Sequence, residues 1–531
     1  MSMEESLSKK VARNTGFNAL GYFVSIVGLF FLTPYVIGKL GAELYGIWII
    51  IAILTGYWGL SDFGIGLSFQ KFVAEYHAQQ DSESVNKIVN SGLAFYCFLG
   101  VVLLGVAILL VDPLLRLANT PISSFDQSRT VALIAIFNLA IANPLSTFAS
   151  ALIGMQHIDL TRKVDMALVV VRVVFYVVVL SYGWGIVGLI LSETFLVLLS
   201  AAMNYAFLVN RFPELRVRPW QLDFTVFRRL FAYGSKLQIS RLAELVTFQS
   251  DRIIVSNFVG LSYVMYADVG GKLLSKIRSL PLIMMSSLIP AISQLGALNQ
   301  TQRIRLAFDR STKYLACCAI PLFVFVAAFA HLIMRIWMGD SFSMASFTLQ
   351  ILGLGYLLNV LTGTMSFVLL GMGDATTQMK VTIVQTVLNI AFSIAFVLSF
   401  GYYGVMIGTS LSLAISSSYF AIAFNKAMEG SLKQILIIMA QPVIASGVSV
   451  VVALIPWIIG GLAPHGRIVD FGLLTAGGLI FFLVYFAILR FTKYFDEWDV
   501  EFILRISPKL TPIGRLISST DPFRGTVKAP R

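Results

Sequence analysis

Charged residues are scarce in this chain, since Asp, Glu, Lys and Arg together make up only 12% of its 531 residues. A soluble domain carries roughly 25% charged residues because its surface must face water. Apolar runs of roughly 20 residues instead recur from one end of the chain to the other, and each is long enough to cross about 30 Å of hydrocarbon. The composition therefore excludes an ordinary soluble protein.

The sequence also lacks the short alternating segments that a transmembrane β-barrel requires. Lipid offers the backbone no hydrogen-bond partner, so uninterrupted apolar runs must form helices. We expect an all-α polytopic membrane protein with about 14 transmembrane helices. The predicted spans are residues 15–37, 44–67, 88–111, 129–154, 164–182, 185–208, 230–258, 262–288, 312–337, 345–371, 379–400, 403–425, 434–460 and 470–490.

Cysteine is rare, and the three cysteines, Cys97, Cys317 and Cys318, all fall in predicted spans. Adjacent cysteines on one helix cannot easily form a disulfide, so we expect buried free thiols. A cleavable signal is lacking too. The apolar run at residues 17–37 is too long for a signal-peptide core and has no small-residue cleavage site, which indicates an uncleaved first span.

The net charge of +12 comes from basic residues that are scattered among the connections. No basic face forms, so the pattern does not favour a nucleic-acid partner. Lys and Arg concentrate in alternate connections, such as residues 209–229, and in the tail after residue 490. Because cytoplasmic loops of membrane proteins are enriched in basic residues, we expect both termini to face the cytoplasm.

The chain contains an internal repeat. The segment ALIGM at residues 151–155 recurs as VLLGM at 368–372, and VIGKLG at 36–41 aligns with VSNFVG at 255–260. Spans one to six thus mirror spans seven to twelve, which predicts two pseudo-symmetric six-helix bundles around a central cavity, related by an axis along the membrane normal. The predicted parts are an N-terminal lobe (1–208), a cytoplasmic linker (209–229), a C-terminal lobe (230–428), two extra spans (429–490) and a basic cytoplasmic tail (491–531).

Charges inside the predicted spans are the main functional signal. Each costs about 2.5–3.5 kcal/mol at the bilayer centre, so most must line a hydrated cavity or lie near a helix end. Basic residues outnumber acidic ones there, which favours an anionic substrate such as a phosphate group. The predicted headgroup-binding residues are Arg172, Lys236, Arg241, Arg252, Lys272 and Lys276, with Arg278 a weaker candidate near a helix end.

The acidic residues suggest coupling to H⁺ or Na⁺. The candidates are Asp62, Glu244, Asp251 and Asp268, while Glu193 adds a further charge to span six. Asp62 could equally cap the end of span two. A simpler alternative for all these charges is that they form buried ion pairs, such as Arg241 with Glu244 or Asp268 with Lys272, which only fix helix packing.

Patterns typical of enzymes are missing. The histidines lie too far apart for a metal site, and the glycine pairs lack the spacing of a nucleotide-binding loop. The longest outer connections, near residues 112–128 and 460–470, are short and contain no paired acids. We therefore expect no catalytic residues, metal or other cofactor.

Several short motifs resemble one known family. LGAELYG at residues 40–46 and LSDFG at 60–64 follow a glycine-rich first span, and the second half carries DR at 251–252, FVG at 258–260 and LIPA at 288–291. Together they resemble the polysaccharide transporter (O-antigen flippase) family of the multidrug/oligosaccharidyl-lipid/polysaccharide exporter superfamily. The resemblance covers nearly the whole chain.

The resemblance implies two bundles that form a V and work by alternating access. It implies a substrate of oligosaccharide on undecaprenyl pyrophosphate, moved from the cytoplasmic to the periplasmic leaflet of the bacterial inner membrane for surface polysaccharide synthesis. It also implies that cationic residues in the cavity are the functional ones. Besides this substrate and membrane lipids, a polysaccharide polymerase and glycosyltransferases are candidate partners.

Three alternatives stay open. Fourteen spans, rather than the family's commoner twelve, are similar to lipid II flippases, so a peptidoglycan precursor is a possible substrate. A drug antiporter that exports cations would need an acidic cavity, and a membrane-embedded glycosyltransferase would need a larger outer loop; the sequence has neither.

Overall fold

The computed structural model describes residues 3–59, 65–117, 120–155, 157–218, 223–285, 288–428, 432–459, 466–496 and 499. Within these ranges every regular element is a helix, as the sequence predicts. The chain divides into two compact units: unit 1 is Met1–Val269 with Ser393–Val405, and unit 2 is Gly270–Phe392 with Met406–Arg531. The domain boundaries predicted from the repeat differ from this division and stay a prediction.

Unit 1 contains the helices of the first half of the chain and the beginning of the next helix, α8. They are α1 (Met3–Gly59), α2 (Ile65–Ala78), α3 (Ser82–Leu117), α4 (Phe125–Gly154), α5 (Ile158–Ser181), α6 (Gly185–Arg211), α7 (Phe224–Phe258) and the first part of α8 (Leu261–Met285). A 3-10 turn, η2 (Ile122–Ser124), precedes α4. The segment Ser393–Val405 in the middle of α14 also belongs to this unit.

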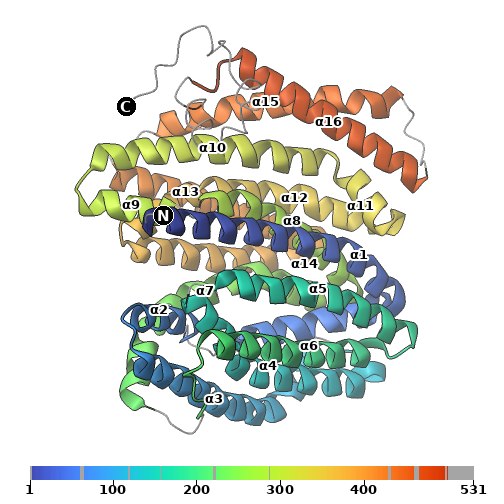
Figure 1. The fold of residues 1–531 in the computed structure, drawn as a ribbon. Helices are drawn as coiled ribbons and strands as arrows, with labels where there is room; N and C mark the ends of the chain where they lie inside the picture. The colour runs from blue at the N-terminus through green and yellow to red at the C-terminus, as the bar shows by residue number, and fades with distance from the viewer. Residues whose placement is uncertain are drawn as a thin grey trace. The chain divides into compact units, whose positions relative to one another are not determined.

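Unit 2 contains the rest of α8 and most of the later helices. They are α9 (Leu288–Ala297), α10 (Thr301–Ala328), α11 (Ala330–Met338), α12 (Ser343–Leu361), α13 (Gly363–Gly371), α14 (Ala375–Ala427), α15 (Leu432–Ile459) and α16 (Arg467–Phe491), with the 3-10 turn η3 (Asp340–Phe342) before α12. Figure 1 labels each helix.

Ten segments of the described residues are long and apolar enough to cross a membrane. The predicted number is higher for two local reasons. Helices α7 and α8 reach spanning length but carry the intramembrane charges discussed below. Helices α1 and α14 each join two predicted spans at a glycine with non-helical geometry, Gly41 (φ 77°) and Gly401 (φ 55°). A positive φ is accessible to glycine at little cost, so the chain turns there while hydrogen bonding continues on either side. With these segments included, the fold has the predicted number of spans.

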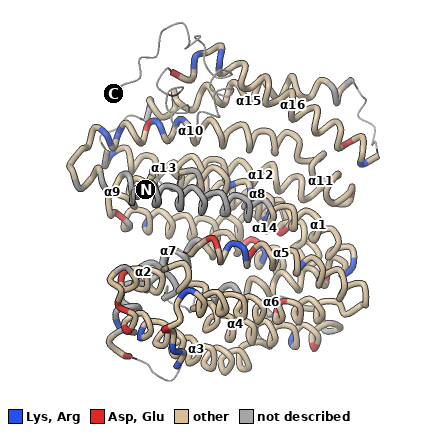
Figure 2. The backbone as a smooth tube through the Cα atoms, in the orientation of Figure 1, with Lys and Arg blue, Asp and Glu red and all other residues tan. Residues whose placement is uncertain are grey.

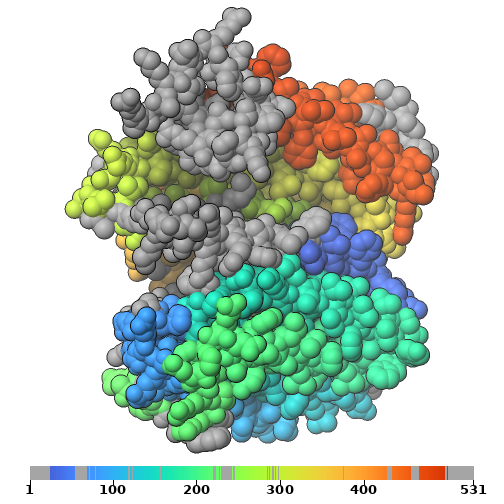
Figure 3. All heavy atoms as spheres, in the orientation of Figure 1, coloured from blue at the N-terminus to red at the C-terminus, as the bar shows by residue number. Residues whose placement is uncertain are grey.

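The core of unit 1 lies between α2, α3, α4 and α6. Phe69 and Val73 of α2 meet Leu93 of α3, and Phe148 and Leu152 of α4 close the cluster. Helix α5 packs along α6 and α1, and Figure 3 shows α5 and α6 side by side in teal and green. Leu160 of α5 and Leu208 of α6 are buried in the same cluster, which orients these two helices.

The two extra spans of unit 2 form a pair. Helix α15 packs against both α16 and α10. Phe329, Ala453 and Phe481 share one buried cluster, and the hydroxyl of Tyr485 donates to the carbonyl of Cys317 at 2.9 Å. The predicted extra spans thus pack on α10 within this unit.

The order of the helices follows the sequence repeat. Short helix α2 precedes α3 as short helix α9 precedes α10, and α4 ends at Gly154 as α13 ends at Gly371. Each of these ends leads into two consecutive spans that are separated by positive-φ glycines, Gly183 and Gly185 in one half and Gly401 in the other. The repeat seen in the sequence is therefore present in the local structure.

Two sequence expectations are wrong in detail. The span placed at residues 312–337 is instead α10, which begins earlier and ends at Ala328, because the helix breaks at Phe329 before α11 starts. Cys97, expected to be buried, is exposed, whereas Cys317 and Cys318 are half-buried; all three are free thiols. Cys97 is adjacent to Phe98, which is 67% exposed, as suits a helix surface that faces lipid.

Candidate functional site

Charges are sparse along the helices and gather mainly near helix ends, which Figure 2 shows as blue and red on a largely tan tube. Four of the predicted site residues cannot be placed in detail. Asp62 lies outside the described residues. The side chains of Lys236, Arg241 and Glu244 also lie outside the described set, although their backbone is part of α7.

The charges of α7 and the start of α8 meet at Asp268. Its carboxylate accepts hydrogen bonds from the hydroxyl of Tyr45 at 2.8 Å and from Nε of Arg252 at 3.2 Å. Nη1 of Arg252 also donates to the carbonyl of Phe248 at 2.8 Å and to Oε1 of Gln249 at 3.2 Å. The side chains of Asp268 and Arg252 are only 4% and 11% exposed. We call Tyr45, Arg252 and Asp268 the Asp268 cluster.

A close helix approach brings Tyr45 to this cluster. A Cβ atom on the next residue, Gly46, would lie 2.4 Å from the carbonyl oxygen of Leu261, which is closer than atoms can come. Only glycine therefore lets α1 reach the start of α8. Tyr45 is uncharged and therefore is not among the site residues predicted from charge, although the Tyr-Gly pair stands in the LGAELYG motif.

Gly46→Ala is expected to destabilise the protein by about 1–3 kcal/mol, because the added methyl must push two backbones apart. The matched control is Gly38→Ala, also in α1, where a new Cβ meets no atom within 4 Å and helix propensity favours alanine. Thermal unfolding of the purified protein in detergent measures both. Equal unfolding midpoints for the two variants would show that the approach at Gly46 is not constrained.

A second ion pair links α5 and α6. Arg172 binds Glu193 through two parallel hydrogen bonds, Nε to Oε1 at 2.7 Å and Nη2 to Oε2 at 3.1 Å. The hydroxyl of Tyr176 donates to the same Oε1 at 2.7 Å. Arg172 keeps 39% of its side chain exposed, so this pair is accessible while the Asp268 cluster is enclosed. We call Arg172, Tyr176 and Glu193 the Glu193 cluster.

The two clusters share one design, an arginine and a tyrosine that bind the same carboxylate. Two predicted headgroup residues, Arg172 and Arg252, thus each have an acidic partner, as the ion-pair alternative anticipates. Arg252 on α7 is one partner of Asp268 on α8, so this ion pair joins two helices. A guanidinium that is paired with a carboxylate can, however, release the two carboxylate oxygens and donate the same hydrogen bonds to two oxygens of another anion.

The remaining candidates lie on α7 and α8. Asp251 is buried, whereas Lys272 and Lys276 are half-buried and follow Asp268 at successive turns of α8. Arg278, the weaker candidate, donates from Nε to Oδ1 of Asn359 on α12 at 3.3 Å. Within the described residues, no group of three His, Cys, Asp or Glu side chains is arranged to hold a metal ion.

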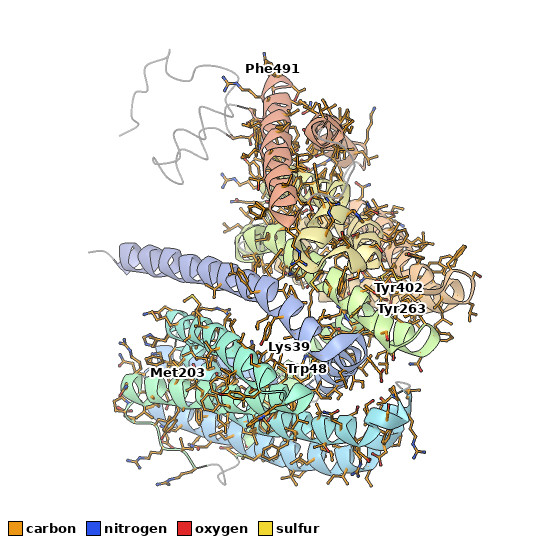
Figure 4. The ribbon with its side chains drawn as sticks, turned by 90° about the vertical axis from the view of Figure 1, so that its right-hand side faces the viewer. Lys39, Trp48, Met203, Tyr263, Tyr402 and Phe491 are labelled. Carbon is orange, nitrogen blue, oxygen red and sulfur yellow. The ribbon has the colours of Figure 1, made fainter. Side chains whose placement is uncertain are left out.

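An aromatic cluster lies at the turns that begin α8 and follow Gly401. The ring centroids of Tyr263 and Tyr266 are 6.2 Å apart, and each lies 6.4 Å from the ring of Tyr402. Figure 4 shows Tyr263 and Tyr402 next to each other. The sequence does not predict this cluster, because periodicity does not reveal ring contacts between distant segments.

Two family models match the chain. The model described as Polysaccharide biosynthesis protein matches residues 11–296, and the MatE model matches residues 237–395. Together the matches extend from the first span into α14.

Two curated relatives are similar in sequence. A candidate O-antigen transporter of Shigella flexneri is 23% identical over 425 residues, which cover 77% of this chain and 96% of the relative. A candidate low-salt glycan biosynthesis flippase, Agl15 of Haloferax volcanii, is 25% identical over 195 residues, which cover 37% of this chain and 41% of the relative.

Solved structures share the fold. The lipid II flippase MurJ in an inward closed conformation matches with a TM-score of 0.69 and 16% identity, over 89% of this chain and 98% of the other. An inward-facing multidrug resistance MATE family transporter of the MOP superfamily matches with a TM-score of 0.64 and 16% identity, over 76% and 94%. At this identity the likeness establishes the fold alone.

Proposed function

Because the chain belongs to the polysaccharide biosynthesis protein family, whose model matches more than half of it, we propose that it is a flippase for a lipid-linked oligosaccharide. The substrate is an oligosaccharide on undecaprenyl pyrophosphate. It moves from the cytoplasmic to the periplasmic leaflet of the bacterial inner membrane by alternating access, for the synthesis of surface polysaccharide. Both termini face the cytoplasm, and no chemical bond of the substrate changes.

One observation carries the proposal: the family match at residues 11–296 contains all six predicted headgroup cations, from Arg172 to Lys276. Cations at membrane depth are costly unless they face a hydrated path or a partner. A pyrophosphate offers several acceptor oxygens, which suit the planar fork of arginine and the point charge of lysine. The substrate headgroup is thus the ligand that this set of side chains fits best.

The two carboxylate clusters supply a mechanism for binding and release. Without substrate, the carboxylates of Glu193 and Asp268 neutralise Arg172 and Arg252. A phosphate group presents paired oxygens like a carboxylate and can replace it on the guanidinium. The displaced carboxylate no longer has a cation beside it and therefore takes up a proton more readily. Uptake and release of this proton couple substrate movement to H⁺. Asp62, Glu244 and Asp251 remain the other proposed coupling residues, with H⁺ or Na⁺ as the ion.

The alternatives are weaker for specific reasons. The curated relatives are named for O-antigen and glycan transport, whereas the lipid II flippase is similar in fold alone. A drug antiporter that exports cations is disfavoured because α7 and α8 carry more basic than acidic residues. A transferase would need an acceptor site and paired acids in an outer loop, which the sequence does not contain.

Reconstituted vesicles test the proposal. Purified protein is placed in vesicles with polyprenyl-pyrophosphate-linked oligosaccharide, and the fraction that becomes accessible to an external glycosidase is followed over time. We expect transfer that is faster than in protein-free vesicles and faster than transfer of lipid II. Transfer of lipid II alone, or export of a cationic dye alone, would replace the proposal with the corresponding alternative.

Arg241→Ala and Lys272→Ala are each expected to reduce glycan export to background, because each removes a cation that would bind the headgroup. Membrane insertion should be normal. The controls are Arg211→Ala and Lys433→Ala, which remove exposed cations outside the predicted cavity. Surface polysaccharide and membrane-fraction protein are measured in a strain that lacks the wild-type gene. Normal export by both cavity variants would contradict the headgroup assignment.

A further inference from the structure

An open groove lies between the beginning of α3 and the linker that follows α6, all within unit 1. Its volume is about 1130 Å³, slightly above the ~300–1,000 Å³ of common small-molecule pockets. The predicted orientation places it on the cytoplasmic side. Its lining residues are Ser82, Glu83, Asn86, Lys87, Asn90, Pro213, Glu214, Arg216, Arg218, Asp223 and Phe224.

The floor of the groove is fixed by two asparagines of α3. Nδ2 of Asn86 donates to the carbonyl of Glu214 at 3.1 Å, and its Oδ1 accepts from the amide of Arg216 at 2.7 Å. Nδ2 of Asn90 donates to the carbonyl of Arg216 at 2.7 Å, and its Oδ1 accepts from the amide of Arg218. Each asparagine thus uses its donor and its acceptor on the linker backbone, so residues 214–218 are held as a strand is held in a sheet.

The held segment alternates between two faces. Leu215 and Val217 pack against the core of α2, α3 and α4. Glu214, Arg216 and Arg218 are exposed on the other face. Period-two alternation is typical of an extended backbone. The polar side chains therefore project from a rigid base and do not themselves hold the fold together.

The charge of the groove is balanced. Its lining contains three basic and three acidic residues, and Lys87 and Glu83 form an ion pair at 2.7 Å. A polyanion or an anionic membrane surface would require an excess of basic residues. Carboxylates that accept, cations that donate and an aromatic side chain, Phe224, 69% exposed, together suit a ligand with many hydroxyl groups and apolar C–H faces.

We propose that this groove binds the glycan of the lipid-linked substrate on the cytoplasmic side, before the headgroup enters the cavity. The inference rests on the proposed function and adds a site that recognises the uncharged oligosaccharide of the substrate. Binding there selects substrates by their sugars, whereas the cavity cations recognise the pyrophosphate that all such substrates share.

Glycan binding tests the groove directly. The probe is the soluble oligosaccharide that mild acid releases from the lipid-linked pool of the native strain, titrated into purified full-length protein by calorimetry. The double variant Glu214→Ala/Arg216→Ala should weaken binding tenfold or more, because it removes exposed groups and leaves both backbone clamps intact. The matched control Glu75→Ala/Arg211→Ala, which removes an exposed acid and an exposed base outside the lining, should stay within twofold of wild type.

Translocation separates this proposal from the proposed function. The groove variant should move a carrier that bears a single sugar at the wild-type rate but a carrier that bears the full oligosaccharide at least fivefold more slowly. Unchanged glycan affinity in the groove variant, or an equal loss in the control variant, would overturn the groove site. If wild-type protein moves neither carrier, the proposed function fails, while the titration still decides whether the groove binds sugar.

Discussion

Asp268→Ala is expected to destabilise the protein by about 3–5 kcal/mol, because it removes the acidic partner that the described residues supply to the buried guanidinium of Arg252. The hydroxyl of Tyr45 loses this acceptor as well. The Arg252 side chain is only 11% exposed, so solvent cannot replace the lost carboxylate. Denaturant unfolding of the purified protein in detergent measures the effect, which corresponds to more than a hundredfold change in the ratio of folded to unfolded protein.

Two further variants separate stability from transport. Arg252→Met combined with Asp268→Leu removes both charges and fills a similar volume, so stability should recover to within about 1–2 kcal/mol of wild type. Transport should stay lost, because both the cation and the titratable acid are missing. Tyr45→Phe should cost about 0.5–1.5 kcal/mol. Full transport by the stable double variant would show that the Asp268 cluster is structural only.

Asp499→Ala is expected to have an effect of similar size, about 3–5 kcal/mol, on the docking of the C-terminal segment. The Asp499 side chain is fully buried. It accepts hydrogen bonds from Nη1 of Arg310 at 2.9 Å, Nζ of Lys313 at 2.5 Å and the hydroxyl of Tyr314 at 2.5 Å. Its removal leaves two cations on α10 without this partner, so limited proteolysis after residue 491 should become at least tenfold faster.

We call the contacts of Asp496 and Asp499 with α10 the C-terminal latch. Asp496 provides the control for it. Its side chain is 48% exposed and also bonds Arg310, so Asp496→Ala should cost at most about 1 kcal/mol. Burial acts to raise the pKa of Asp496, but the amide of Asp499 and the guanidinium of Arg310 outweigh it and hold that pKa below its ordinary value. A carboxylate with a lowered pKa stabilises the folded state when the pH is above the ordinary carboxyl pKa of ~4. This contribution is lost as the pH falls through the lowered pKa. Proteolysis should therefore be constant from pH 7 to about pH 5 and faster only in stronger acid. Equal cleavage rates for the Asp496 and Asp499 variants would contradict a latch centred on the buried residue.

Hydropathy alone predicts most of this fold, because lipid forces each apolar run into a helix. The helix α6, for example, begins at Gly185 as predicted, and α12 and α13 together end at Gly371 as the tenth span does. The family assignment made from short motifs is confirmed by the match to residues 11–296. The ends of spans near charged residues were harder to predict. Helix α10, for example, begins about three polar turns before its apolar stretch, and hydropathy does not detect those turns.

The partners of the charges could not be predicted, because pairing depends on how each helix is rotated. The sequence suggested Arg241 with Glu244 and Asp268 with Lys272, both on single helices. Those two pairs stay predictions, whereas the described residues add pairs between helices: Arg252 with Asp268 joins α7 to α8, and Arg172 with Glu193 joins α5 to α6. Tyr45 is neutral, so a prediction based on charge does not include it.

The C-terminal latch was missed for a related reason. The tail after residue 490 was interpreted as basic, since its net charge is positive. Its first part nevertheless presents two acids, Asp496 and Asp499, to basic residues of α10. The net charge of a whole segment does not reveal two acidic residues within it that form ion pairs with another helix.

The asparagine clamp on the linker has a consequence for evolution. The hydrogen bonds from Asn86 and Asn90 to the linker reach main-chain atoms of residues 214–218, so the identity of the outward side chains at positions 214, 216 and 218 is not fixed by folding. A lineage can exchange these three residues without repacking any transmembrane helix. Substrate range can then diversify at the cytoplasmic surface while the transport machinery is inherited unchanged.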